Sequence, residues 1–169
     1  MMKKGYKRRF STSFNQGFTL IELMIAVVVI AILAAIATAS YSQFIKRSTA
    51  AQAQQEIAKL SEQLERYKSR NFSYKGFNAS YLYSGGTGFD VSTQVLTLNN
   101  TYQISIVDGM LSTPLLTDTN SLGNQWAIRA ISSDPSNYSY LLTSNGLRCK
   151  NKSSNLVNYN GCGIGAEEW

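Results

Sequence analysis

The chain has 169 residues and a formal net charge of +6, from 16 basic and 10 acidic residues. This length is typical of one modest domain. The charge is uneven, because residues 1–17 contain no acid but five basic residues, Lys3, Lys4, Lys7, Arg8 and Arg9. Without these five of the 16, 11 basic residues face 10 acidic ones, so the basic pI does not indicate a nucleic-acid-binding surface.

The sequence contains no histidine. Its absence removes the commonest general base and the nucleophile pairs Ser-His and Cys-His. Two cysteines are too few for a cysteine-rich zinc site, and no histidine can complete one. We therefore expect no enzymatic activity, no metal site and no cofactor.

Residues 1–17 are polar and basic, with no apolar periodicity. A basic segment before an apolar run holds an N-terminus on the cytoplasmic side of a membrane. Residues 18–39 are apolar, and Glu22 is their single charged residue. As a helix this segment would be about 33 Å long, enough to cross the hydrocarbon core of a bilayer. The sequence therefore predicts a cytoplasmic leader followed by a transmembrane helix.

The helix is expected to continue over residues 40–70 as an amphipathic helix. Ile57, Leu60, Leu64 and Tyr67 are three or four residues apart and form one apolar stripe. Such a stripe favours packing against a sheet. The first half of the helix, by contrast, is apolar all round and requires lipid or other helices.

Residues 71–100 are expected to form a connecting loop, because they show no clear period. After them, residues 102–106, 126–131, 138–143 and 147–150 have strand character, and Asn145-Gly146 is a strong hairpin signal. These segments predict an antiparallel sheet of about four strands within residues 101–169. The fold class is therefore α+β, with a long helix packed on the sheet and residues 40–169 forming one globular head.

Cys149 and Cys162 lie near one end of a chain that we expect to be exported. Two cysteines in this setting favour a single disulfide, which would close residues 101–169 at the C-terminal end. Two free thiols are the alternative. A disulfide closing this loop would stabilise the head by about 3 kcal/mol.

The most informative segment is Gly17-Phe18-Thr19-Leu20-Ile21-Glu22. A carboxylate within a membrane span costs about 2.5–3.5 kcal/mol at the helix centre and less near an end. If the chain is cut after Gly17, Phe18 acquires an ammonium group. In a staggered helix bundle, Glu22 of one chain can then meet Phe18 of its neighbour, and this pairing would set the axial register.

This segment resembles the class III signal of type IV prepilins: a short basic leader, Gly17 before the cut, Phe18 after it, Glu22 as the fifth mature residue and an apolar run. The resemblance implies cleavage between Gly17 and Phe18 by a prepilin peptidase and N-methylation of Phe18. It also implies a pilin-like fold. The expected partners are other pilin subunits, the peptidase and the inner-membrane assembly machinery. The chain would be a single-pass inner-membrane protein before assembly and part of a cell-surface pilus afterwards.

The resemblance extends to the minor pilins of type IVa pili. It is carried by Leu64-Glu65-Arg66-Tyr67, Asn71-Phe72-Ser73-Tyr74 and Leu142-Thr143-Ser144-Asn145-Gly146-Leu147-Arg148. The paired cysteines resemble the pilin disulfide loop. Ala31 and Ala39 depart from the family, because many pilins have Gly and then Pro there, in a segment that unwinds in assembled pili. We therefore do not transfer the unwound segment to this chain.

The resemblance implies a structural subunit, a minor pilin that supports pilus assembly, twitching motility, adhesion or DNA uptake. A pseudopilin of type II secretion is the first alternative. The second is a pilus-borne DNA- or surface-binding module, whose aromatic residues between Tyr74 and Tyr83, with Lys75, would stack on bases. Two readings of the N-terminus compete: a plain single-span anchor, and a secretory signal cleaved after Ala37 or Ala39.

Overall fold

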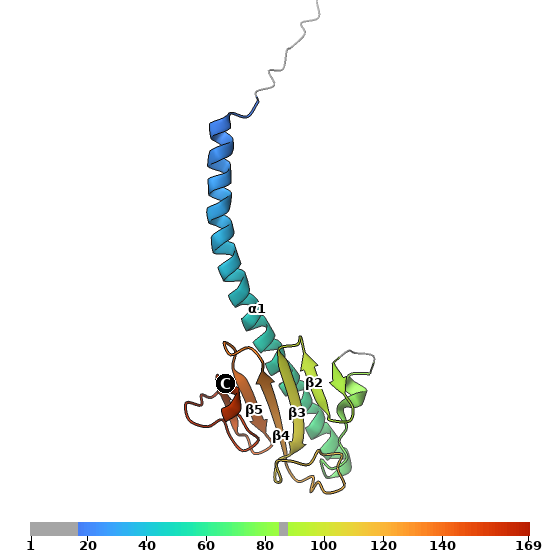
Figure 1. Ribbon diagram of the computed structural model, residues 1–169. Helices are drawn as coiled ribbons and strands as arrows, with labels where there is room; N and C mark the ends of the chain where they lie inside the picture. Colours follow the sequence, from blue (N-terminus) through green and yellow to red (C-terminus); the bar gives the residue numbers. More distant parts are fainter. Residues whose placement is uncertain (1–16, 85–87) are drawn as a thin grey trace, which may run out of the picture. The chain divides into compact units, whose positions relative to one another are not determined.

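The computed structural model describes residues 17–84 and 88–169 (Figure 1). Residues 1–16, which make up nearly all of the expected leader, lie outside the described residues. The chain divides into two compact units, Met1–Tyr41 and Ser42–Trp169.

A single helix, α1 (Leu20–Asn71), runs through the described part of the first unit and into the second. Leu, Ile, Ala, Glu and Gln dominate its sequence, and it contains neither Gly nor Pro. Ala31 and Ala39 both lie inside it without interruption. The helix ends where Phe72 adopts a left-handed conformation (φ 61°) and its N–H donates to the Lys68 carbonyl at 2.7 Å.

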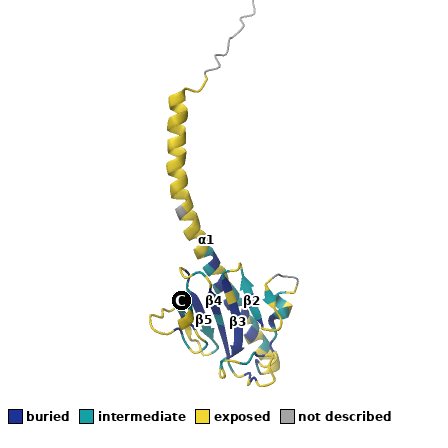
Figure 2. Cartoon of the chain, viewed as in Figure 1, coloured by how far each residue is buried: buried dark blue, intermediate teal, exposed yellow. Residues whose placement is uncertain are grey.

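In the first unit, the surface of α1 is uncovered (Figure 2). The helix is long and apolar enough to cross a membrane, and none of its most apolar window is buried within the chain. Exposure of so many large aliphatic side chains to water is unfavourable by about 25 cal/mol per Å². This part of the helix therefore requires an apolar environment from outside its own chain.

The second unit contains a six-stranded antiparallel sheet in the order β1-β2-β3-β4-β5-β6. The α+β architecture of a long helix packed with an antiparallel sheet is confirmed. Two short 3-10 helices, η1 and η2, accompany the strands. The bounds are η1 (Ala79–Leu82), β1 (Phe89–Asp90), β2 (Val95–Leu98), β3 (Tyr102–Asp108), β4 (Trp126–Ser132), β5 (Ser139–Thr143), β6 (Arg148–Asn151) and η2 (Ser154–Leu156).

The sheet is larger than the expected four strands, because β1 and β2 lie within residues 71–100, where the sequence predicts a loop. β1 has two residues and β2 has four, which is too short for alternation to stand out. Left-handed residues flank β2, at Gln94 before it and at Asn99 and Asn100 after it. These strands are set by pairing rather than by a local pattern: β2 pairs with β3, where Leu96 lies opposite Ile104, and β1 pairs with β2.

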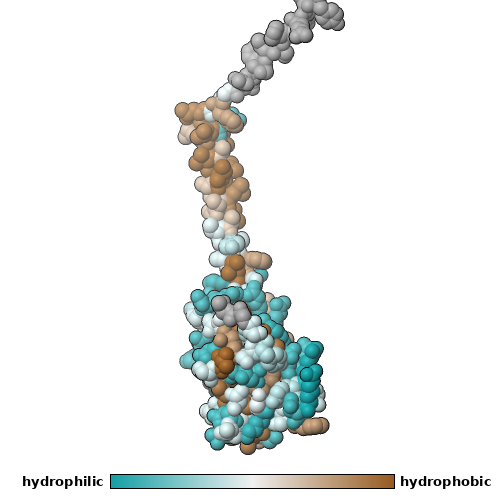
Figure 3. Space-filling model, turned by 90° about the vertical axis from the view of Figure 1, so that its right-hand side faces the viewer, coloured by the Kyte–Doolittle hydropathy of each residue, from teal (hydrophilic) through white to brown (hydrophobic). Residues whose placement is uncertain are grey.

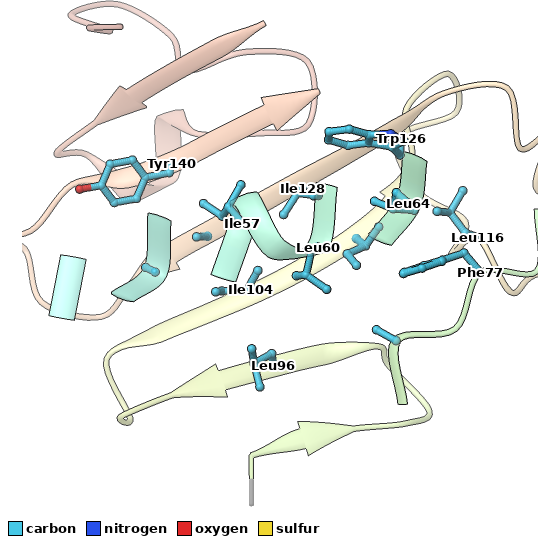
Figure 4. Close-up of a cluster of buried hydrophobic side chains, with 14 of the residues drawn as sticks. Ile57, Leu60, Leu64, Phe77, Leu96, Ile104, Leu116, Trp126, Ile128 and Tyr140 are labelled. Carbon is cyan, nitrogen blue, oxygen red and sulfur yellow. The ribbon is translucent and has the colours of Figure 1, made fainter. Parts of the chain in front are cut away.

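The stripe on α1 forms the centre of the core (Figure 4). Ala53, Ile57, Leu60 and Leu64 are each 2% exposed or less. Full burial of a Leu or Ile side chain contributes about 1.5–3 kcal/mol. The stripe packs with buried side chains of the sheet and of the segment after the helix, including Tyr74, Phe77, Leu96, Tyr102, Ile104, Ile106, Leu116, Trp126, Ile128 and Tyr140.

The other side chains of the central strands form a second core. Val107, Ala127 and Leu141 cluster with Cys149, Val157 and Cys162. Cys149 and Cys162 are joined by a disulfide. The C-terminal segment is also held by side-chain hydrogen bonds from Asn151 to the carbonyls of Cys162 (2.8 Å) and Ile164 (2.9 Å). The head thus covers apolar side chains on both faces of its sheet with its own chain.

Candidate functional site

The start of α1 is fixed by Thr19. The Thr19 hydroxyl accepts a hydrogen bond from the Glu22 N–H at 3.3 Å, and the Thr19 carbonyl accepts one from the Leu23 N–H at 3.2 Å. Thr followed three residues later by Glu is the sequence pattern of a capping box. Sequence reasoning missed this role of Thr19, although the spacing could have revealed it. Gly17 and Phe18 precede the cap and are exposed, non-helical residues.

Glu22 lies in the first turn of α1, where a negative charge is favoured by the helix dipole. Its carboxylate has no hydrogen-bond or ion-pair partner within residues 17–84 and 88–169. Thr19 binds the backbone of Glu22, not its side chain. No cationic side chain among the described residues therefore neutralises the charge of Glu22.

The other three acidic residues of α1 all have partners. The Glu62 carboxylate pairs with Arg66. The Glu56 carboxylate accepts a hydrogen bond from the Tyr83 hydroxyl at 2.8 Å and pairs with Lys59 at 3.3 Å. Glu65 accepts from the Tyr74 hydroxyl and from the Trp126 indole. The head part of the helix thus satisfies its carboxylates internally.

Glu65 is an example of a carboxylate of α1 that is satisfied by hydrogen bonds within the head. Its carboxylate lies 2.8 Å from the Tyr74 hydroxyl and 3.1 Å from the Trp126 indole nitrogen. Burial, reinforced by the hydrogen bond to Glu65, raises the pKa of Tyr74 to about 12. Tyr74 therefore remains a neutral donor at physiological pH, and it ties the segment after α1 to the helix.

An apolar surface surrounds Glu22. Figure 3 shows hydrophobic side chains along the helix of the first unit and a mostly hydrophilic face on the head. Phe18 is 82% exposed, and the large aliphatic residues from Leu20 to Ile36 are all exposed. The candidate site is therefore an apolar helix with one uncompensated carboxylate near its start. Such a surface suits association with lipid or with other helices.

The aromatic loop that the sequence suggested as a base-stacking platform has a different environment. Tyr74 and Phe77 are each 2% exposed and belong to the core. Tyr83 stacks on Phe89 at a centroid distance of 5.1 Å. Tyr81 is 56% exposed, whereas the Lys75 ammonium donates to the Thr119 carbonyl at 2.7 Å. Most of these rings thus support the head and are not free to stack on nucleotides.

A fully buried carboxylate, Asp108, organises the loop after β3. It accepts hydrogen bonds from the N–H groups of Met110, Leu122 and Gly123 and from the Ser121 hydroxyl, at 2.7–2.9 Å. Burial alone would raise the pKa of Asp108, but these hydrogen bonds outweigh it, and the pKa lies below its ordinary value.

Gly123 is required by the geometry of this loop. Its φ is +65°, and a Cβ there would lie 2.4 Å from the Lys75 nitrogen. Its carbonyl accepts from the Tyr74 N–H at 2.8 Å. Asp108 therefore has a structural role, because it joins the turn at Met110 to the loop at residues 121–123, and no local sequence pattern indicates this role.

Comparison with known protein families gives a match at the N-terminal end of the chain. Residues 13–38 match the family described as the prokaryotic N-terminal methylation motif. No solved structure matches the chain. The match includes Gly17, Phe18, Thr19 and Glu22 and most of the apolar run. The chain thus carries the N-terminal methylation motif, and this motif, the long apolar helix and the antiparallel sheet are together consistent with a type IV pilin-like prepilin.

Proposed function

We propose that this chain is a structural subunit of type IV pili, a minor pilin that is incorporated through its N-terminal helix. One observation carries the proposal: the apolar helix of the methylation motif is uncovered and contains a carboxylate without a partner in the described chain. A filament of such helices supplies both the apolar environment and the partner. In this role the subunit would support pilus assembly, and through it twitching motility, adhesion or DNA uptake.

Processing is the first step of this function. A prepilin peptidase would hydrolyse the bond between Gly17 and Phe18 on the cytoplasmic side, which leaves an amine on Phe18. Gly17 and Phe18 are exposed and non-helical, which supports access by a peptidase to the bond between them. Methylation of an amine can keep its positive charge, so a methylated Phe18 remains a cation.

Pairing is the second step. The Phe18 ammonium of one subunit would meet the Glu22 carboxylate of its neighbour in the helix bundle. Each charge is unfavourable in lipid alone, and pairing offsets the cost of both. A subunit whose pair is unmade keeps an uncompensated charge in the membrane, so the pairing also favours one axial register over others.

The N-terminus of the mature protein tests the processing step. Intact mass spectrometry and Edman sequencing are expected to find Phe18 as the first residue, carrying a methyl group on its nitrogen. A mature chain that begins at Thr38 or Ser40 would instead identify an ordinary secretory signal and overturn the proposal.

Substitution of Glu22 tests the pairing step. We expect Glu22→Ala to be processed normally but to be strongly depleted from sheared pili, measured by quantitative mass spectrometry. Glu62→Ala is the matched control, because it removes an exposed carboxylate from the same helix outside the motif. Equal incorporation of Glu22→Ala and the wild type would refute the pairing.

Two features support a pilus over a type II secretion pseudopilus. The head contains the disulfide Cys149–Cys162, which resembles the pilin disulfide loop. The segment from Leu64 to Tyr74 also resembles minor pilins. Deletion of the gene is expected to reduce surface pili and to leave enzyme secretion intact. The opposite result would identify a pseudopilin.

A further inference from the structure

A basic hollow lies in the head, where the first residues of α1 in this unit meet the ends of β5 and β6. Its volume is about 610 Å³. Lys46 and Arg47 line it from the helix, and Tyr138, Tyr140 and Lys152 line it from the sheet side. No acidic side chain lines it among the residues that the structure describes. The hollow is therefore suited to an anion.

The three cations of the basic hollow differ in their partners. Lys46 has one carboxylate nearby, Asp134, at 3.8 Å. The pKa of Asp134 lies below its ordinary value, chiefly because the Ser136 hydroxyl binds it, with a smaller effect of Lys46, so Asp134 is ionised at neutral pH. Arg47 and Lys152 have no carboxylate within ion-pair distance in the described parts of the chain. The positive charges thus exceed the one negative charge at the rim.

Lys152 is held over the hollow by an aromatic ring. Its ammonium lies 5.4 Å from the centroid of Tyr138. Lys150 contacts the same ring at 4.8 Å, but its ammonium is also 3.4 Å from the Glu167 carboxylate. The pairing of Lys150 with Glu167 leaves Lys152 as the cation of this strand end that is available to a ligand.

Along the sequence, the helix residues that line this hollow begin shortly after the apolar run. Phe44 comes two residues before Lys46 and is 66% exposed, and Tyr41, three residues earlier, is 67% exposed. Aromatic residues that close an apolar helix are typical of the membrane–water interface, where lipid phosphates lie. Basic side chains at this level interact with anionic headgroups.

We propose that the basic hollow binds the phosphate group of an anionic phospholipid while the chain resides in the membrane, before it polymerises. This proposal rests on the membrane insertion that the proposed function requires. Arg47 would bind the phosphate through its planar fork of donors, and Lys46 and Lys152 would add point charges. Nucleic acid fits less well, because the footprint is small and the rings offer no stacking face: Tyr140 is buried and Tyr138 lies beneath two ammonium groups.

The test uses the full chain in detergent micelles and measures lipid binding by native mass spectrometry. The probes are phosphatidylglycerol and phosphatidylcholine with identical acyl chains. We expect phosphatidylglycerol to bind at least fivefold more tightly. Each of Lys46→Gln, Arg47→Gln and Lys152→Gln is expected to weaken its binding about fivefold, as for the loss of one cation near a lipid surface. All three side chains are exposed, so the head should still fold.

Arg70→Gln is the matched control, because it removes one exposed cation from the same helix outside the hollow. Its affinity for phosphatidylglycerol should equal that of the wild type. Equal binding of the two lipids, or an equal loss in Arg70→Gln, would overturn the proposal, because the attraction would then be unspecific.

Two further probes distinguish the source of the phosphate. Inorganic phosphate that binds as tightly as phosphatidylglycerol would overturn the lipid assignment in favour of a free anion. A short single-stranded oligonucleotide that binds more tightly, and loses affinity in the same three variants, would overturn it in favour of nucleic acid.

The N-terminus of the same samples separates this proposal from the proposed function. A wild type that begins at Phe18 but does not distinguish the lipids would overturn the lipid site alone. A chain that prefers phosphatidylglycerol but begins at Ser40 would overturn the pilin assignment while the hollow keeps its ligand.

Discussion

Two stretches of α1 carry apolar residues, and they differ in what covers them. From Leu20 to Ile36 the large aliphatic side chains are exposed, whereas Ala53, Ile57, Leu60 and Leu64 are buried beneath the sheet. The first stretch is apolar on all sides, and the second is apolar on one side. The pattern around the helix axis therefore decides whether a helix buries its surface within its own chain.

The carboxylates of the helix follow the same division. Glu56, Glu62 and Glu65 find partners in the second unit, and Glu22 finds none in the described residues. A helix segment whose apolar side chains are buried and whose carboxylates are paired within its own chain contributes to the stability of the fold. A helix segment whose apolar side chains are exposed and whose carboxylate is unpaired contributes to association with other molecules instead. Substitutions in the buried and in the exposed stretch of α1 should therefore have different effects.

The largest expected effect is on the buried stretch. Leu64→Ala should lower the free energy of unfolding of the head by about 2–5 kcal/mol, because it leaves a cavity beneath the sheet. Leu33→Ala removes the same atoms from an exposed position of the same helix, so the stability of the head should not change. Chemical denaturation of both variants in detergent, followed by tryptophan fluorescence, measures the difference.

The comparison would fail if Leu33→Ala destabilised the head as much as Leu64→Ala. The two units would then not be energetically separate. Incorporation into pili supplies the converse readout: Leu33→Ala should weaken it at a given level of folded protein, and Arg70→Ala, at an exposed position near the other end of the helix, should not.

The second-largest expected effect concerns the C-terminal segment, which covers the other face of the sheet and is held by the disulfide Cys149–Cys162. Replacement of both cysteines by Ser should lower the free energy of unfolding by about 3 kcal/mol, because the disulfide restricts the unfolded chain. The contacts of Asn151 and Trp169 hold the same segment independently. We therefore expect the variant to keep its sheet, measured by circular dichroism.

Reduction of the wild type is the matched control for the cysteine variant, since it breaks the bond without a substitution. Reduced protein and the double variant should unfold at similar denaturant concentrations. A variant as stable as the oxidised wild type would show that the noncovalent contacts alone hold the segment.

The third effect is a pH dependence from Asp108. Its pKa is lowered in the folded head, so its contribution is present above the pKa of the unfolded chain, about 3.9, and is lost as the pH falls through the folded value. Asp108→Asn should cost about 1–3 kcal/mol at pH 7, because buried N–H groups lose an acceptor. It should also flatten the loss of stability below about pH 4.

Asp118→Asn serves as the control for Asp108, because Asp118 is an exposed carboxylate in the same region. Denaturation curves between pH 2 and pH 7 should follow the wild type in this control. If Asp108→Asn retained the full acid sensitivity of the wild type, another carboxylate would be its source.

The features that were predictable from sequence have a local pattern. The four strands β3 to β6 alternate over four or more residues or flank Asn145-Gly146, and the structure contains all of them. The helix stripe from Ile57 to Tyr67 was predictable because its spacing of three and four residues persists, and all four side chains pack in or against the core. β1 and β2 were missed because pairing, of β2 with β3 and of β1 with β2, makes them strands, and not their own sequence.

The contacts that could not be predicted from the sequence join residues that lie far apart along the chain. Asp108 meets residues 13–15 positions away, and Glu65 meets Trp126 across 61 positions. The alternative function of base stacking would require accessible rings between Tyr74 and Tyr83, yet most of these rings contribute to the core. In each case the residue type allowed several roles, and the tertiary fold selected one.

The smallest expected effect returns to the exposed stretch, at Thr19. Thr19→Ala removes the hydroxyl that accepts from the Glu22 N–H, and loss of such a cap costs about 1 kcal/mol. The cost should appear as about fivefold faster hydrogen exchange in the first turn of α1, with no change in the core of the head. Thr19→Ser should restore slow exchange, because it keeps the oxygen.

Thr38→Ala is the control for Thr19→Ala, since Thr38 donates to the Ala35 carbonyl within the helix and caps nothing. If exchange at Glu22 and Leu23 were equal in Thr19→Ala and the wild type, helix formation at this end would depend on its surroundings alone. The exposed stretch of α1 would then depend on other molecules for its helical structure as well as for its packing partners.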